Sequence, residues 1–427
     1  MFPWRGRTRP SVTNTESSGA TLRVLGSLAE VARADWDACA NPGWSSEGAP
    51  LGIPEGCPES AVRAAAWNPF LTHDFLWSLE ESGAATRRTG WLGQHLVLDG
   101  PDGKPAAILP AYVKSHSMGE YVFDHGWADA FERAGGRYYP KVQCSVPFTP
   151  VPGRRLLVKP GPEADRHRTA LAGGAMALAQ RYGASSVHAT FLTEADWEVL
   201  AGQGFLRRTD QQFHFVNENY RDFDDFLEAL ASRKRKAIRR ERRDALTGSL
   251  EIDHLTGRDL TEAAWDAFFA FYMDTGGRKW GRPYLNRKFF SLIGERMADR
   301  ILLVVARRGS KPIAGALNFI GSDALYGRYW GALEEHPFLH FELCYYQAIE
   351  WAIRHRLPRV EAGAQGEHKV ARGYRPTTTY SAHWIADPSF RKAVADYLQR
   401  ERRQVASDEA ALAEYLPFRH SDREENG

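Results

Sequence analysis

The sequence predicts a mixed α/β fold built from two related units in tandem. Strand-like and helix-like segments alternate through both halves of the 427 residues, a length that suits two or three domains. The segment 103–113, GKPAAILPAYV, resembles 310–320, SKPIAGALNFI, and 175–189 resembles 348–362. Because both matches occur at equivalent places in the order of elements, we expect each half to form a mixed, twisted sheet flanked by helices.

In the first half, turn and capping signals fix the expected elements. The turn GPDGK at 100–104 lies between two apolar runs, 94–99 and 104–114, and predicts an antiparallel hairpin. A helix is expected at 163–182, because acidic residues begin it and Gly183 follows its end. Other elements of this half are predicted at 21–28, 69–84, 185–192 and 211–217.

The second half repeats this order. Two apolar segments, 301–308 and 311–321, flank a short turn and predict the matching hairpin. Helices are predicted near 222–247, 261–275, 286–299 and 342–355, and strands at 325–332 and 359–364. We therefore divide the chain into a disordered lead-in at 1–20, a first unit at 21–216 and a second unit at 217–420.

Composition and charge exclude several classes of protein. With 43% hydrophobic and 25% charged residues, the chain has an ordinary globular composition. The 55 Lys and Arg against 53 Asp and Glu give a net charge of +2, which excludes a globally basic nucleic-acid coat, and no DNA partner is expected. No transmembrane segment is expected, because no apolar run approaches the ~20 residues that a bilayer crossing needs. An apolar signal-peptide core is also missing from the N-terminus, so a cytoplasmic location is expected.

The motifs of several enzyme classes are missing as well. The sequence contains no GxGxxG, GxxxxGK[ST], HExxH or GxSxG, which argues against dinucleotide-binding, P-loop, zincin and α/β-hydrolase chemistry. The four cysteines form no CxxC pair, so neither a disulfide framework nor a metal site is predicted. We interpret Cys144 and Cys344 as small buried residues, since a nucleophilic role would require a neighbouring base.

The segment 232–243, SRKRKAIRRERR, carries eight basic residues in twelve. As a helix it could contact phosphates, either those of a tRNA backbone or those of a carrier cofactor. A solvated charged face is the competing interpretation. The residues predicted to bind the donor in this segment are Arg235, Lys236, Arg239 and Arg240.

The segment 359–376, RVEAGAQGEHKVARGYRP, predicts a strand end followed by a glycine-rich polar loop, the kind of place where sites form in α/β sheets. Glu361, Glu367 and His368 are candidate catalytic bases, because each can accept a proton from an incoming amine. Lys369 and Arg372 are candidate donor-binding residues, since cations hold carboxylate or phosphate. An irregular loop with paired charges is the alternative.

Aromatic and basic residues elsewhere supply further candidates. Arg328 on the strand 325–332 is assigned to donor binding, and Tyr329 and Trp330 beside it to acceptor binding, although aromatic residues on a strand more often pack a core. The remaining candidate acceptor-binding residues are Lys141 and Gln143 in the first half, with Lys279 and Trp280 in a basic, aromatic connector.

Five segments together resemble the FemAB-like N-acyltransferases of the peptidoglycan biosynthesis/recognition type. They are GEYVFDHGWADAF, YYPKVQCSVPFTPVPGRRLL, KWGRPYLNRKFF, YGRYWGALEEHPFLHFELCYYQAIEWAI and GAQGEHKVARGYRP…YSAHW. The resemblance covers roughly residues 20–420. It implies tandem domains of the GNAT acyltransferase fold and the transfer of an acyl or aminoacyl group to an amine, with no tightly bound cofactor.

The resemblance leaves the donor open between aminoacyl-tRNA, acyl-CoA and a carrier-protein thioester. The GNAT pyrophosphate-binding signature, [RQ]xxGx[GA], has no match, because Gln180–Ser185 and Arg328–Leu333 both fail at the last position. With the basic segment 232–243, this favours aminoacyl-tRNA or a carrier-protein thioester. The acceptor is expected to be a small molecule or peptide with an amine, and a non-catalytic recognition module is the alternative function.

We expect the reaction centre in the second unit, between the strand with Arg328–Trp330 and the strand with Glu361. Amide formation needs a neutral amine, a held carbonyl and a donor for the developing oxyanion. A main-chain N–H near Gly363 could be that donor. The first unit, around Lys141 and Gln143, is the alternative location.

Overall fold

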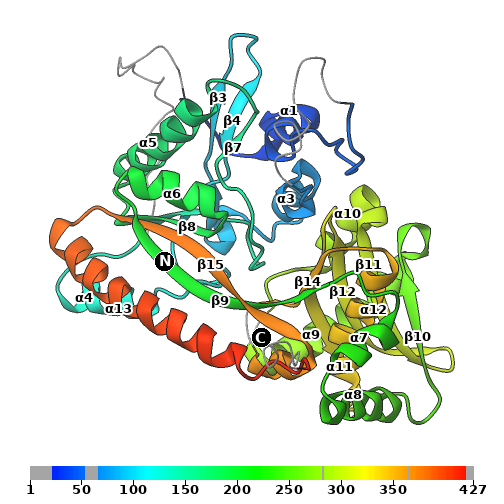
Figure 1. Cartoon of the computed structure of the whole chain (residues 1–427). Helices are drawn as coiled ribbons and strands as arrows, with labels where there is room; N and C mark the ends of the chain where they lie inside the picture. The colour runs from blue at the N-terminus through cyan, green and yellow to red at the C-terminus, as the bar shows by residue number, and fades with distance from the viewer. Residues whose placement is uncertain (1–21, 53–65, 281–282, 364–365, 420–427) are drawn as a thin grey trace.

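The computed structural model describes residues 22–52, 66–280, 283–363 and 366–419, without the side chains of 278–280. These residues form one large mixed sheet and one small antiparallel sheet, and helices flank both sheets (Figure 1). The α/β class predicted from the sequence is therefore confirmed.

The strands fall into two sheets. The small sheet has the order β1 (Leu22–Leu25), β3 (His95–Asp99), β4 (Pro105–Leu109) and β7 (Leu157–Val158). The large sheet has the order β10 (Leu250–Leu255), β11 (Ile301–Arg308), β12 (Lys311–Ile320), β13 (Ala324–Ala332), β14 (Arg359–Glu361), β9 (Leu206–Val216), β15 (Tyr374–Ile385), β8 (Ser186–Leu192), β6 (Lys141–Cys144), β5 (Tyr112–Lys114) and β2 (Trp91–Gly93).

Helices connect and cover these strands. In the first half they are α1 (Arg33–Ala40), α3 (His73–Glu81), α4 (His125–Arg133), α5 (Ala164–Tyr182) and α6 (Glu194–Gly202). In the second half they are α7 (Phe223–Ala229), α8 (Ser232–Ala245), α9 (Glu262–Trp280), α10 (Arg287–Met297), α11 (Leu339–Phe341), a π-helical turn at Glu342–Tyr346, α12 (Gln347–Arg354) and α13 (Pro388–Ala413).

The large sheet repeats one arrangement in both halves. In the first half β6 pairs in parallel with β8, and α5 connects them. In the second half β13 pairs in parallel with β14, and the continuous helical segment 339–354 connects them. All other pairs in the large sheet are antiparallel. This repeated strand–helix–strand unit is the structural counterpart of the sequence repeat.

The two halves exchange strand ends at the centre of the sheet. The long strands β9 and β15 pair with each other in antiparallel fashion from Leu206 to Phe215. The C-terminal end of β9 then pairs with β14 of the second half, while the C-terminal end of β15 pairs with β8 of the first half. Figure 1 shows these two strands crossing the middle of the molecule. The division of the chain at residue 216 stays a prediction, because both halves contribute to this junction.

One apolar core also joins the halves. Phe70, in the short 3-10 turn Pro69–Leu71, and Phe75, near the start of α3, pack against Phe319 of β12 with ring centroids 4.8 and 5.5 Å apart. Phe75 also contacts Phe289 of α10 at 5.8 Å. These residues belong to one buried cluster. The two halves are therefore joined by a shared apolar core as well as by the hydrogen bonds of the large sheet.

The structure differs from the sequence prediction at several elements. The helix expected at 222–247 is two helices, because Leu230 and Ala231 leave the helical path to pair with the C-terminal segment at Phe418 and Pro417. The helix expected at 342–355 begins with the π-helical turn. Sequence periodicity assigned no element to α4, β6, β10, β15 or α13. In β15 the polar run Arg375–Thr379 hides the alternation that marks a strand.

Candidate functional site

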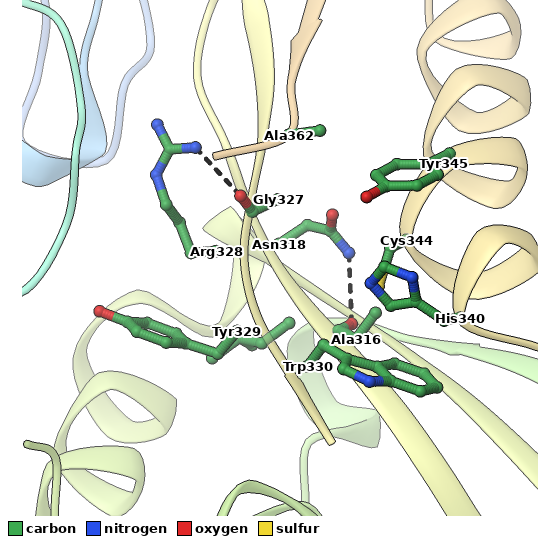
Figure 2. A pocket seen from close by; sticks show the side chains of 11 residues that line it. Ala316, Asn318, Gly327, Arg328, Tyr329, Trp330, His340, Cys344, Tyr345 and Ala362 are labelled. Carbon is green, nitrogen blue, oxygen red and sulfur yellow. Dashed lines mark hydrogen bonds between the residues drawn. The ribbon is translucent and has the colours of Figure 1, made fainter. Parts of the chain in front are cut away.

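The candidate site lies where β13 and β14 part. The two strands pair only between Ala324–Tyr326 and Arg359–Glu361, after which β14 ends and β13 continues. A bulge in β13 leaves Arg328 without a partner residue on β12. A cavity of about 130 Å³, the inner cavity, opens at this point (Figure 2). Its lining residues are Ala316, Leu317, Asn318, Gly327, Arg328, Tyr329, Trp330, His340, Cys344, Tyr345 and Ala362.

The bulge turns the main chain of Arg328 towards this cavity. Its side chain is 1% exposed and extends away from the cavity in Figure 2, yet the residue as a whole is partly exposed, so the exposed part is main chain. A bulged residue is left out of the ladder of strand hydrogen bonds. Exposed main chain of Arg328 therefore borders the inner cavity.

A buried ion-pair cluster holds the bulge in place. The Arg328 guanidinium donates to the Glu361 carboxylate at 2.9 Å and to the Glu361 main-chain oxygen at 3.1 Å, while Arg359 donates to the same carboxylate at 3.2 Å. Burial opposes the charge of Glu361, but His214, Arg359 and Arg328 outweigh it and lower the pKa of the carboxyl. Glu361 is thus a buried, ionised residue that positions Arg328, an arrangement that does not favour it as a proton acceptor.

Asn318 presents an unsatisfied acceptor to the inner cavity. Its side-chain amide donates to the main-chain oxygens of Leu302 and Ala316, both at 3.2 Å. Its Oδ1 atom is buried and accepts no hydrogen bond from any described residue, and Figure 2 shows it directed into the cavity. A buried acceptor left unpaired costs about 1–3 kcal/mol. A ligand with an N–H or O–H group at this point would remove that cost.

A tyrosine–histidine pair forms another wall. Tyr345 comes from the π-helical turn, and its hydroxyl is 2.9 Å from Nε2 of His368. Burial raises the pKa of Tyr345, so the phenol stays neutral. Burial lowers the pKa of His368, as do the charges of Arg372 and Lys369, so the imidazole is mostly neutral at pH 7. The pair can relay a proton from the cavity to His368, which is exposed.

The cations of the following loop bind protein groups. Lys369 donates to the main-chain oxygen of Gly363 at 3.1 Å, and Arg372 forms two 2.9 Å bonds with Glu241 of α8. Burial and the charge of Arg328 lower the pKa of Lys369 to about 8. Glu367 is exposed on the same loop. These contacts fix the loop beside the inner cavity.

The basic helix α8 is partly neutralised by its neighbours. Arg235 pairs with Glu228 at 2.9 Å and Arg239 with Asp224 at 3.1 Å, both acids being on α7. Arg240 pairs within the helix with Asp244, at 3.3 Å. Among the described residues, Lys236 and its neighbours Arg233 and Lys234 have no carboxylate within ion-pair distance. These three cations, which we call the open basic set, are available to a polyanion.

Of the candidate acceptor residues of the second half, Trp330 lines a larger outer cavity of about 730 Å³. Trp330 and His340 line both cavities, so these two side chains lie between the two spaces. The Tyr329 hydroxyl donates to the Phe148 main-chain oxygen at 2.9 Å and so contacts the first half. Lys279 and Trp280 end α9, but their side chains lie outside the described part of the chain.

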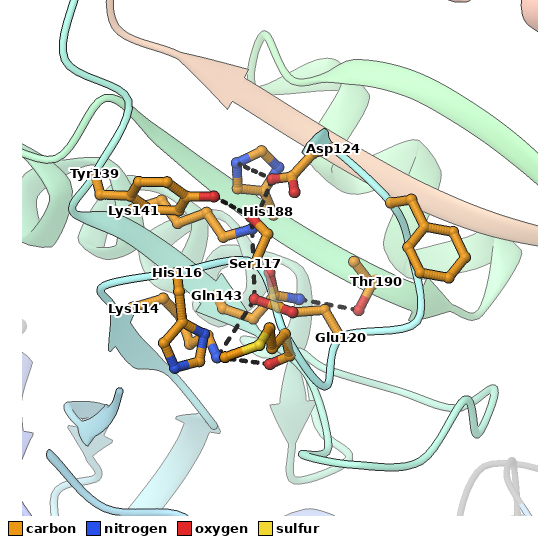
Figure 3. Close-up of polar contacts among 12 residues, drawn as sticks. Lys114, His116, Ser117, Glu120, Asp124, Tyr139, Lys141, Gln143, His188 and Thr190 are labelled. Carbon is orange, nitrogen blue, oxygen red and sulfur yellow. Dashed lines mark hydrogen bonds and ion pairs between the residues drawn. The ribbon is translucent and has the colours of Figure 1, made fainter. Parts of the chain in front are cut away.

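Lys141 and Gln143 belong to a buried polar network in the first half (Figure 3). The Lys141 ammonium lies 2.6 Å from Asp124, 2.7 Å from the Ser117 hydroxyl and 3.4 Å from Glu120. Gln143 donates to Thr190 at 3.1 Å. Both side chains are 1% exposed and engaged with protein groups.

The first half has no comparable parting of its parallel strands in the described chain. After β6 ends, Gly153 forms a further parallel bridge with Leu192 at the end of β8. Phe148 and Val151, in the connecting segment, belong to the apolar core shared by both halves. The open strand junction therefore lies in the second half.

Sequence reasoning missed several of these residues. Asn318, His340, Cys344 and Tyr345 line the inner cavity, although only Arg328, Tyr329 and Trp330 were selected from the sequence as residues near it. Asn318 lies in an otherwise apolar strand segment, KPIAGALNFI, and this isolated polar residue was the available signal. Cys344 and Tyr345 lie on the π-helical turn, and His340 lies on α11 directly before it; no sequence pattern indicated this turn.

Metal and membrane features were searched in the same part of the chain. The described residues contain no group of three or more His, Cys, Asp or Glu arranged to hold a metal ion. None of the described helices combines the length and apolar character required to cross a bilayer. The two segments compared above with the pyrophosphate-binding signature lie on β13 and at the C-terminal end of α5.

Comparison with known proteins assigns the chain to a family. The family model described as FemAB-like, peptidoglycan biosynthesis/recognition, matches residues 27–420. The chain therefore belongs to this family, as its motifs predicted. No curated protein matches the chain.

Solved structures with a similar fold have low sequence identity. The crystal structure of FemX is 12% identical, with a TM-score of 0.46, and the match covers 74% of this chain and 93% of FemX. L-PGS from Bacillus licheniformis is 8% identical with a TM-score of 0.44, covering 80% and 96% of the two chains. A tandem GNAT protein from the clavulanic acid biosynthesis pathway is 12% identical with a TM-score of 0.42, covering 87% and 99%.

Proposed function

We propose that this protein is an N-acyltransferase that moves an acyl or aminoacyl group from an activated donor to an amine, forming an amide. Aminoacyl-tRNA and thioesters are the candidate donors. A peptide or small-molecule amine, such as one on a peptidoglycan precursor, is the candidate acceptor. The family assignment supports this class of reaction.

The inner cavity is the observation that carries the proposal. A main-chain amide at the Arg328 bulge, the Oδ1 acceptor of Asn318 and the Tyr345–His368 pair all face or adjoin one space. Acyl transfer requires these kinds of group: a donor for the oxyanion, a contact that orients the substrate and a route for the proton.

The reaction can be written with the residues present. The donor carbonyl accepts a hydrogen bond from the Arg328 amide, and the amine attacks the carbonyl carbon. The proton lost by the amine passes to the Tyr345 oxygen as the Tyr345 hydroxyl proton passes to Nε2 of His368. The donor's leaving group departs as the amide forms and takes up one proton from solvent or from His368. Because the phenol stays neutral, Tyr345 acts only as a relay, and His368 is the base.

Single-turnover transfer with Tyr345→Phe and His368→Gln tests this function. Purified protein is mixed with radiolabelled aminoacyl-tRNA or acyl-CoA pools and candidate amines. Because proton relay typically contributes about 10²–10⁴-fold in rate, both variants should lose most of the transfer rate while still binding the donor. Tyr346→Phe is the matched control, since that neighbouring hydroxyl contacts Glu241 instead of the cavity. If the Tyr345→Phe variant transferred the acyl group at the wild-type rate, Tyr345 would not relay the proton.

A non-catalytic recognition module is the second candidate function. The family description names recognition beside biosynthesis, so a recognition function is compatible with the family. A recognition module would bind the precursor or the donor and give no amide product with any pool. Saturable binding of a peptidoglycan precursor without turnover in the wild-type protein would favour it over the transferase.

A further inference from the structure

Cys344 has a distinctive place in the inner cavity. Most residues of the π-helical turn are buried, namely Glu342, Leu343, Tyr345 and Tyr346, whereas Cys344 is partly exposed. Its side chain lines the inner cavity together with His340, which precedes it by four positions on the same helical segment (Figure 2). Residues at this spacing lie on one helix face. Cys39 and Cys144, by contrast, are fully buried.

We propose that the transfer is covalent and that Cys344 is its nucleophile. The Cys344 thiolate takes the acyl group from the donor, and the amine then takes it from Cys344. This inference rests on the proposed transferase function. It replaces the direct attack on the donor carbonyl written above by two steps through Cys344, and the Tyr345–His368 pair still takes the amine proton.

The surroundings of Cys344 suit such a step. His340 is the imidazole placed to take the thiol proton, since it lines the same cavity. The Lys369 ammonium is close enough for its charge to interact with that of the thiolate, an attraction that favours the ionised nucleophile. The main chain of Arg328 borders the same cavity, and we assign its N–H group to the oxyanion. A nucleophile, a base and an oxyanion donor therefore share one cavity.

Asn318 is an independent sign that a ligand occupies this space. The residue is 1% exposed, and its unpaired Oδ1 atom is directed into the inner cavity on the side of Tyr345 (Figure 2). The inner cavity, at about 130 Å³, accommodates a small acyl or aminoacyl group, and the outer cavity of about 730 Å³ leaves room for the rest of the donor. His340 lines both cavities, and we place the bond to the donor's leaving group beside it.

The two steps balance. In the first, the thiol proton moves to His340, the sulfur–carbonyl bond forms, and the bond to the leaving group breaks. The leaving group takes the proton from His340, which gives the free carrier and a Cys344 thioester. In the second, the amine nitrogen attacks the thioester, and its proton passes through Tyr345 to His368 and then to solvent. The carbon–sulfur bond breaks, and the departing Cys344 thiolate takes up one proton from solvent. With a thioester donor the first step exchanges one thioester for another, so no oxidant or energy source is needed.

The activated ester p-nitrophenyl acetate is a probe that needs no knowledge of the natural donor. We expect a burst of p-nitrophenolate equal to one per wild-type molecule, about ten-fold or more faster than the reaction of glutathione at the same pH. Peptide mass spectrometry of the quenched protein should find one acetyl group, on Cys344. Adding an amine, or hydroxylamine, should release it.

Cysteine and histidine variants test which residues are responsible for the burst. Cys344→Ala should abolish the burst and the adduct, with Cys344→Ser as a second variant if Cys344→Ala does not fold. His340→Asn should slow the burst by about 10²–10⁴-fold, whereas His355→Asn, which changes an exposed histidine stacked on Trp351, should leave it unchanged. Cys39→Ala, Cys144→Ala and Cys57→Ala are the thiol controls, and each should keep the full burst. Cys57 lies outside the described residues.

The outcomes separate this inference from the proposed function. Covalent transfer would be wrong if Cys344→Ala or Cys344→Ser formed the amide at the wild-type rate and Cys344 of the native protein carried no acetyl group. The proposed transferase function would not be affected by that result. An acetylated Cys344 with no amide from any donor pool would instead count against the transferase.

Discussion

Glu361 is a fully buried carboxylate whose charge is matched by Arg328 and Arg359. From the sequence it was one of three candidate bases, because it ends a strand beside a polar loop. Its neighbours could not be read from the sequence, since Arg328 lies on a different strand. Of the three candidates, His368 has the exposure, the neutral form and the Tyr345 contact that a base requires, while the buried ion pair gives Glu361 a positioning role.

Glu361→Gln should therefore destabilise the fold. Removing one partner of a buried ion pair typically costs about 3–5 kcal/mol, because the arginines keep an uncompensated charge. Urea unfolding at pH 7 measures the difference. Glu334→Gln is the control, since Glu334 pairs with Arg308 and Lys311 at the surface, and it should change stability little.

The pH dependence follows from the lowered pKa of Glu361. The carboxyl binds its proton less readily in the folded protein than in the unfolded chain, where its pKa is near 4.5. Its contribution is fully present above pH 4.5 and is lost as pH falls through the folded pKa. The stability difference between wild type and Glu361→Gln should accordingly shrink below pH 4.5. If this stability difference did not change with pH, the assignment of Glu361 as an ionised carboxylate would be wrong.

At the scale of elements, α8 shows that neighbouring helices determine how much of a helix's positive charge stays unpaired. Within the helix Glu241 and Asp244 are the acidic residues, so the sequence predicts a strongly cationic surface. The structure places α7 beside it, and Asp224 and Glu228 pair with Arg235 and Arg239. Glu342 and Glu350, from the helical segment behind it, pair with Arg242. Only part of the charge remains available to a polyanion.

Salt-dependent tRNA binding should separate the two groups of cations. Replacing the open basic set, Arg233, Lys234 and Lys236, with Ala should weaken binding and reduce the salt slope by about 2–3, since each phosphate contact contributes about 0.7–0.9. Replacing Arg235, Arg239 and Arg240 is the matched triple control. It should change the slope less, because protein carboxylates already neutralise these side chains. Equal slopes in both triple variants and in the wild type would identify α8 as a solvated face.

At the scale of the whole molecule, the two halves are interlocked. The last residues of β9 complete the second half, and the last residues of β15 complete the first. The core around Phe75, Phe289 and Phe319 also draws on both halves. An isolated half would expose strand edges and part of this core, both of which promote aggregation.

Separate expression tests this dependence. Fragments 22–216 and 217–419 should each fail to give a dispersed NMR spectrum, whereas co-expression of the two should recover a folded complex. The full chain is the reference, and its unfolding should be a single cooperative transition. A dispersed spectrum from either fragment alone would show that the exchanged strands are not required for folding.

The sequence determined the α/β class, the repeated order of elements and the family, because each depends on local periodicity or on contiguous motifs. It also predicted the candidate site near Arg328–Trp330, since a polar, aromatic strand next to a glycine-rich loop is a local signal. Tertiary structure decided which groups face the cavity. The bulge at Arg328, the unpaired acceptor of Asn318, the Tyr345–His368 contact and the neutralisation of α8 all join residues far apart in the chain, and hydrogen-bond and charge pairing between distant residues leaves no local pattern to read.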